Sequence, residues 1–228
     1  MSKSSFLNEA IYNGAFKGLC TAAVLLLNYL RWPAAGQAFL IPALVWTLIV
    51  KLAYPSKQHL NSGFSLAMYL SGSIGVVEAI MRIAGQLVGT VAAMISLRQV
   101  AMLLGLRRLL GVSMVGVPKG GSDANHTQMV EFVGSAAAYF FILCSMRWWK
   151  PADQPVIVAT FVVAWQAFTK VQLDPSGVLC GAVLTGQGYD RLFRTYWAAQ
   201  AAGATVAGCT YGLLTADFWA PREKAKRD

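Results

Sequence analysis

Six apolar segments that approach or reach the length of a membrane span dominate this chain. They run about Ala10–Leu30, Ala34–Tyr54, Ala79–Leu97, Gln128–Met146, Pro155–Thr169 and Thr195–Asp217. A helix needs about 20 mostly apolar residues to cross a bilayer. Only 13% of the 228 residues are charged, whereas soluble domains average about 25%. The sequence therefore predicts an all-α, multi-pass integral membrane protein that forms a single membrane domain, residues 1–228.

Basic residues give the chain a net charge of +9. Many of them lie at the ends of the apolar segments, as Arg31, Lys51 and Arg147 do, and others lie in the basic C-terminal tail, residues 218–228. This distribution is typical of positive charge that faces lipid headgroups. Because no aromatic-basic motif accompanies these residues, nucleic acid is not an expected partner, and the lipid bilayer is.

Two further apolar stretches are too short to span a bilayer. They cover residues 62–72 and 175–186, and each lies between two of the longer segments. About ten residues favour a re-entrant half-helix over a full crossing. A third stretch, Gln99–Val117, carries Arg107 and Arg108 in its middle. A span there would bury two guanidinium groups, so we expect a connecting loop over residues 98–126, with a seventh span as the alternative.

The two halves of the chain resemble each other. Aligning Asn61 with Asp174 brings leucine against leucine on both sides, and it places Gln86 and Gln200 at 25 and 26 positions downstream, each in an Ala-x-Gln-x-x-Gly sequence. A glutamate begins the first span of each half, Glu9 in one and Glu131 in the other. Each half holds three spans and one half-helix, and an odd number of spans inserts the second copy upside down. The sequence thus predicts an inverted repeat, residues 9–97 and 127–217.

The polar residues that open the two half-helices are good helix starters. Asn61 and Asp174 accept hydrogen bonds readily from the first turn of a helix, and Pro175 tolerates the first helical position. In an inverted repeat the two helix N-termini meet near the membrane midplane, where their partial positive charges repel cations. Two ordinary polar loops that each precede a well-capped short helix are the alternative.

These motifs together resemble the aquaporin, or major intrinsic protein, family, whose members carry two Asn-Pro-Ala boxes on re-entrant half-helices. His59-Leu60-Asn61-Ser62-Gly63 matches the first box and the histidine before it with two substitutions. Asp174-Pro175-Ser176 matches the second box with two substitutions. The third span matches Ala-Gln-x-x-Gly through "GQLVG". The resemblance covers about Glu9 to Asp217 and implies six transmembrane helices plus two half-helices.

The family resemblance also implies a selectivity filter, and here the sequence departs from the family. An arginine usually follows the second box, but this chain has Gly177. Gapless alignment places Ile41 at the aromatic filter position and Val162 at the position that is often histidine. These residues imply an apolar filter without its cation. His59 is expected at the pore mouth as a hydrogen-bonding residue.

Two lysines near these segments are open to more than one interpretation. Lys17 lies inside the first apolar segment, where it either extends toward the headgroups or pairs with a carboxylate such as Glu9. Lys170 lies shortly before Asp174 and either belongs to a loop or forms an ion pair with that aspartate.

The resemblance implies a passive channel for water or small neutral solutes, assembled as a homotetramer. A non-conducting structural subunit of a larger membrane complex is the alternative, favoured by the altered boxes and the missing arginine. An ion-coupled transporter that uses Asp174 is a third hypothesis. No nucleophile elbow, phosphate loop or carboxylate pair occurs, so we expect neither enzyme activity nor a cofactor. With only two histidines, a histidine metal site is not expected either.

Overall fold

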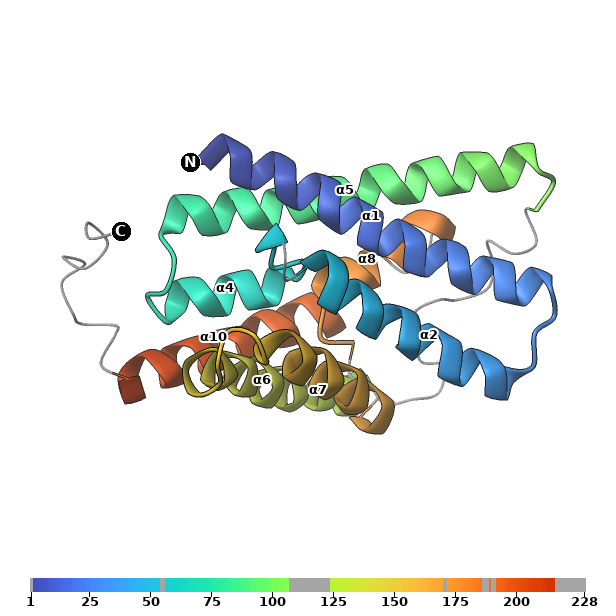
Figure 1. The fold of residues 1–228 in the computed structure, drawn as a ribbon. Helices are drawn as coiled ribbons and strands as arrows, with labels where there is room; N and C mark the ends of the chain where they lie inside the picture. The colour runs from blue at the N-terminus through green and yellow to red at the C-terminus, as the bar shows by residue number, and fades with distance from the viewer. Residues whose placement is uncertain are drawn as a thin grey trace.

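The structure, a computed structural model, describes residues 2–53, 56–106, 124–169, 172–185, 189 and 192–215. These residues are almost entirely helical, and no β-strand occurs among them. The helices are α1 (Ser2–Tyr29), α2 (Ala34–Leu48), α4 (Ser62–Leu70), α5 (Val76–Leu103), α6 (Ala124–Trp148), α7 (Gln154–Thr169), α8 (Pro175–Thr185) and α10 (Ala198–Thr215). Figure 1 shows them as one bundle in which the short helices α4 and α8 lie among the longer ones.

Within the described ranges, three helices are long and apolar enough to cross a membrane: α1, α5 and α6. The second and fifth predicted spans form shorter helices, α2 and α7, of 15 and 16 residues. α2 continues directly into a π-helical turn, Ile49–Ala53, and α10 directly follows a π-helical segment, Leu192–Trp197. The sequence pattern did not indicate these π-helical segments.

The predicted boundaries needed several corrections. α1 begins at Ser2 rather than near Ala10, and α5 extends to Leu103 rather than Leu97. The expected connecting loop, 98–126, therefore contains the end of α5 and the start of α6. The first half-helix ends at Leu70, because the chain turns at Gly72, whose φ of 77° suits glycine. Arg107, Arg108, Lys170 and the tail 218–228 lie outside the described residues.

Close helix contacts explain the glycines of the Ala-x-Gln-x-x-Gly sequences. A Cβ atom on Gly89 of α5 would overlap the carbonyl oxygen of Ala10 of α1. A Cβ atom on Gly203 of α10 would come within 2.7 Å of the carbonyl oxygen of Phe132 of α6. The two motifs thus bring α5 onto α1 and α10 onto α6, as small residues do in membrane helix pairs.

The half-helices cross between the two halves of the chain. α4 packs against α10, where a Cβ atom on Gly208 would come within 2.5 Å of the Ala67 carbonyl oxygen. α8 in turn packs against α5. Figure 1 shows α4 and α8 beginning near the middle of the bundle and running toward opposite ends. This arrangement brings the two predicted boxes together in the interior.

Candidate functional site

Asn61 and Asp174 cap the two half-helices, as the sequence predicts. The side-chain Oδ1 of Asn61 accepts a hydrogen bond from the backbone N–H of Phe64 at 3.0 Å. The Oδ1 of Asp174 accepts from the backbone N–H of Ser176 at 3.0 Å and from the Ser176 hydroxyl at 2.8 Å. Pro175 begins α8, where its missing N–H leaves no hydrogen bond unmade.

The two caps lie next to each other in space. Asn61 Nδ2 donates a hydrogen bond to the carbonyl oxygen of Leu173 at 2.9 Å, although the two residues are 112 positions apart. Leu60 and Leu173, which precede the caps, share an unusual backbone conformation with φ of 52° and 58°. The structure therefore brings the two boxes together with matching local geometry.

A buried glutamate supports the loop before each box. The Glu9 carboxylate accepts hydrogen bonds from the backbone N–H groups of His59 at 2.8 Å and Leu60 at 3.3 Å. The Glu131 carboxylate accepts from the backbone N–H of Gln172 at 3.0 Å. Each carboxylate also accepts from a glutamine of the repeated motif, Gln86 at 3.0 Å and Gln200 at 2.9 Å. The glutamates and glutamines that the repeat aligned thus perform the same task in each half.

His59 makes a hydrogen bond through Nδ1 to the hydroxyl of Ser65 at 2.9 Å and lies edge-on to the ring of Phe64. Its expected hydrogen bonding is therefore confirmed. Its place at a pore mouth stays a prediction.

Lys17 was not predicted at this site. Its Nζ donates to Asp174 Oδ2, and both side chains are 11% exposed. Pairing of Lys17 with a carboxylate is therefore confirmed, and extension toward the headgroups is wrong, because the ammonium is buried against Asp174. The partner is not Glu9, which pairs instead with Arg82, whose Nη1 lies 2.7 Å from Oε1. The available signal was spacing: Glu9, Asn13, Lys17 and Thr21 recur every four residues and form a buried polar stripe on α1.

A matching stripe runs along α6. Glu131, Ser135 and Tyr139 are buried and stand 122 positions after Glu9, Asn13 and Lys17. Tyr139 is therefore the counterpart of Lys17, and it contacts the opposite box. Its hydroxyl donates to the Leu173 carbonyl and lies 3.2 Å from Asn61 Oδ1. A Cβ atom on Gly63 would overlap the Tyr139 ring, so this residue of the first box leaves room for the tyrosine.

The predicted filter positions come from three helices. Ile41 on α2, Val162 on α7 and Gly177 on α8 are all partly exposed. α2 and α7 contact each other, and Trp46 Nε1 donates to the Thr160 hydroxyl at 3.1 Å across that contact. Gly177 lies beside the ion pair, because a Cβ atom built on it would be 3.6 Å from Lys17 Nζ and 3.8 Å from Asp174 Oδ2. The grouping of these positions as a filter stays a prediction.

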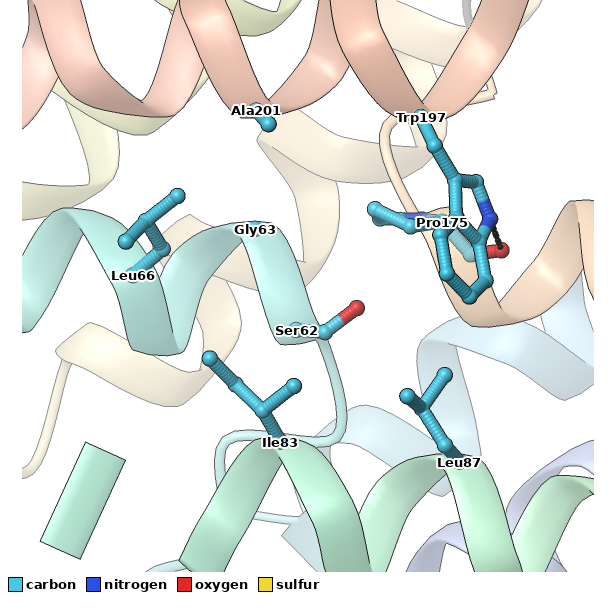
Figure 2. Close-up of a pocket in the computed structure, with 8 residues that line it drawn as sticks. All are labelled: Ser62, Gly63, Leu66, Ile83, Leu87, Pro175, Trp197 and Ala201. Atoms are coloured by element: carbon cyan, nitrogen blue, oxygen red, sulfur yellow. Dashed lines mark hydrogen bonds between the residues drawn. The ribbon is translucent and has the colours of Figure 1, made fainter. Parts of the chain in front are cut away.

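Residues of both boxes also line a pocket of about 140 Å³. It is bounded by the starts of both half-helices, by α5 and by the beginning of α10, and Figure 2 shows its lining: Ser62, Gly63, Leu66, Ile83, Leu87, Pro175, Trp197 and Ala201. Trp197 Nε1 donates to the Pro175 carbonyl at 2.8 Å. The buried Ser62 hydroxyl has no hydrogen-bond partner within the described part of the chain. None of the predicted filter positions lines this pocket.

Comparison with known proteins supports the resemblance that the boxes indicated. No family model matches the chain. The chain is similar to aquaporin-2 of Ovis aries, with 25% identity over 197 residues that cover 81% of this chain and 70% of that protein. The apolar helices of membrane length and this similarity agree. The chain is an integral, multi-pass membrane protein and a distant, divergent homologue of the aquaporins, the major intrinsic protein family.

Proposed function

We propose that the chain forms a passive transmembrane channel for water or small neutral solutes. One observation carries the proposal: two capped half-helices begin side by side in the interior, joined by the hydrogen bond from Asn61 to Leu173. Short broken helices persist in a membrane only where protein buries them or where they line a watery cavity. Facing N-termini also supply unpaired N–H donors and partial positive charge, which suit passage of neutral polar molecules.

The proposed architecture has six transmembrane helices and the half-helices α4 and α8. Residues 9–97 and 127–217 form the two copies of an inverted repeat. The matched contacts of Glu9 and Glu131 support this assignment. The π-helical continuations lengthen the second and sixth helical runs beyond α2 and α10. We also propose a homotetramer with one pore in each protomer, and chemical crosslinking or native mass measurement tests it, since a purely monomeric protein would contradict it.

The proposed pore contains the box residues Asn61, Ser62, Gly63, Asp174, Pro175 and Ser176, with Ile41, Val162 and Gly177 as its filter. Two apolar side chains and a glycine provide no fixed donor, so the filter should discriminate poorly among small neutral solutes. Gly177→Arg narrows this region and should reduce glycerol passage more than water passage. A Cβ atom at this position would meet its nearest neighbours at ordinary contact distances of 3.6 to 3.8 Å.

Osmotic light scattering of vesicles that contain the purified protein tests the function. An impermeant solute reports water permeability, and glycerol or urea then reports solute permeability. Empty vesicles of the same lipid and size are the control. We expect the protein to raise water permeability and at least one solute permeability. If neither exceeds that of empty vesicles, the channel is excluded, and the chain is a non-conducting subunit of a membrane assembly.

A further inference from the structure

The position after the second box raises a question about charge. Related channels place a fixed cation there, and this chain has Gly177. A carboxylate, Asp174, stands at the start of the same helix, where it opposes the positive helix end instead of reinforcing it. A neutral-solute channel built this way has a negative group where it should repel cations.

Lys17 supplies the missing charge from another helix. Its ammonium donates to Asp174 Oδ2 and lies 3.6 Å from the place where a side chain on Gly177 would begin. The ring of Phe16 adds a second favourable contact, with its centroid 5.2 Å from Nζ. An ammonium has three donors, so a lysine that gives one to Asp174 keeps two for other partners.

The second half of the molecule indicates that a side chain at this position can hold the boxes together without a charge. Tyr139, the counterpart of Lys17, makes only uncharged hydrogen bonds, to Asn61 of the first box and to the carbonyl of Leu173, which precedes the second box. Burying an ion pair costs more desolvation than burying such neutral groups, and it is weak evidence for stability. A charged pair in one half and a neutral pair in the other therefore differ mainly in the electrostatic potential that they create.

From these contacts we propose that Lys17 is a charge-selectivity residue of the channel and that Asp174 positions its ammonium. The inference rests on the proposed function, because it assigns the cation that excludes ions from that pore. Lys17 cancels the Asp174 carboxylate and leaves the positive half-helix ends to repel protons and metal cations.

Ion-leak measurements in vesicles test this assignment. Lys17→Met should raise potassium and proton leak at least about tenfold. Removing a unit charge at contact distance lowers the energy barrier for a passing cation enough to raise its rate of passage by more than a factor of about ten. Lys17→Met/Gly177→Arg places a cation on residue 177 of α8, which lies beside the position of the Lys17 ammonium, and should restore low leak. Lys51→Met, at an exposed lysine, is the matched control and should change nothing.

Asp174→Asn provides an opposite result. It leaves the ammonium unpaired and should lower cation leak while raising chloride leak, and Lys17→Met/Asp174→Asn should remove the chloride leak. If Lys17→Met does not fold, this second pair still decides the question. If the pair only stabilised the fold, both single variants would raise cation leak equally, in proportion to the fraction of protein that is no longer folded. Adding Gly177→Arg to Lys17→Met would then not lower the leak.

The two proposals fail separately. If the wild type conducts water and Lys17→Met leaks no more than Lys51→Met, the assignment of Lys17 is overturned and the channel stands. If the wild type conducts neither water nor solute, the channel is excluded, and the assignment of Lys17 falls with it. If neither effect appears, both are excluded.

Discussion

The two halves of the molecule support their boxes with the same scaffold but with different charges. In each half a buried glutamate accepts hydrogen bonds from the loop before a half-helix, and a glutamine of the repeated motif binds that glutamate. Two turns further along the same helix, the first half presents Lys17 and the second presents Tyr139. The comparison separates what holds the fold, which both halves share, from what sets the local charge, which only one half carries.

The glutamates also differ in their own neighbours. Arg82 lies 2.7 Å from Glu9 and also contacts Glu78 at 2.9 Å. The position that corresponds to Arg82 in the second half is Tyr196, 114 residues later. The first half thus neutralises Glu9 with a cation, whereas Glu131 relies on N–H donors from Gln172 and Gln200. Helix α1 thus takes part in two buried ion pairs: its Glu9 pairs with Arg82, and its Lys17 pairs with Asp174.

The largest expected effect on stability comes from Lys17→Met, which breaks the charged side of the comparison. Removing the ammonium leaves Asp174 as an uncompensated carboxylate that is 8% exposed. Breaking a buried ion pair at one partner costs about 3 to 5 kcal/mol. Thermal unfolding of the detergent-purified protein should show a loss of that size.

The double variant Lys17→Met/Asp174→Asn is the control for this prediction. It removes both charges and makes the second box resemble the neutral first box, so most of the lost stability should return. A double variant that is as unstable as the sum of both single variants would show that the two residues do not interact energetically.

The sequence predicted the shared scaffold far better than it predicted the charged pair. Asn61, Asp174 and Pro175 have strong local preferences for helix starts, so their caps followed from residue type alone. Gln86 and Gln200 followed from the repeat. The contact of Lys17 with Asp174 joins residues 157 positions apart, and no local preference encodes it. Extending the repeat from Glu9 and Glu131 along α1 and α6 would have aligned Lys17 with Tyr139 and indicated both.

A second prediction tests whether the two halves share one packing design. Gly89→Ala and Gly203→Ala each place a methyl group against a backbone carbonyl of the partner helix, which cannot move aside as a side chain can. Overpacking of this kind costs about 1 to 3 kcal/mol. Unfolding measurements should give losses of similar size for the two variants, and both should leave the sign of ion selectivity unchanged.

Gly18→Ala is the matched control for these glycines. Gly18 lies on α1, the helix against which Gly89 packs, but its Cβ atom would meet only the Cβ of Ala93 at 3.7 Å, an ordinary contact. Because glycine inside a helix is about 1 kcal/mol less favourable than alanine, this change should be neutral or slightly stabilising. A loss as large as that of Gly89→Ala would mean that the α1–α5 contact is tight along its whole length.

The smallest expected effect comes from Tyr139→Phe, on the neutral side of the comparison. The change removes one hydroxyl, but its two acceptors keep other partners: Leu173 still accepts from Asn61 Nδ2, and Asn61 Oδ1 still accepts from Phe64. A neutral hydrogen bond contributes about 1 kcal/mol, and no buried charge is exposed by its loss. Tyr139→Phe should therefore lose about 1 kcal/mol of unfolding free energy and leave ion leak at the wild-type value. Tyr29→Phe, at a tyrosine that is 56% exposed, should change neither quantity. A rise in cation leak for Tyr139→Phe comparable to that of Lys17→Met would mean that any loosening of the boxes admits ions, and the difference in charge between the halves would then have no part in selectivity.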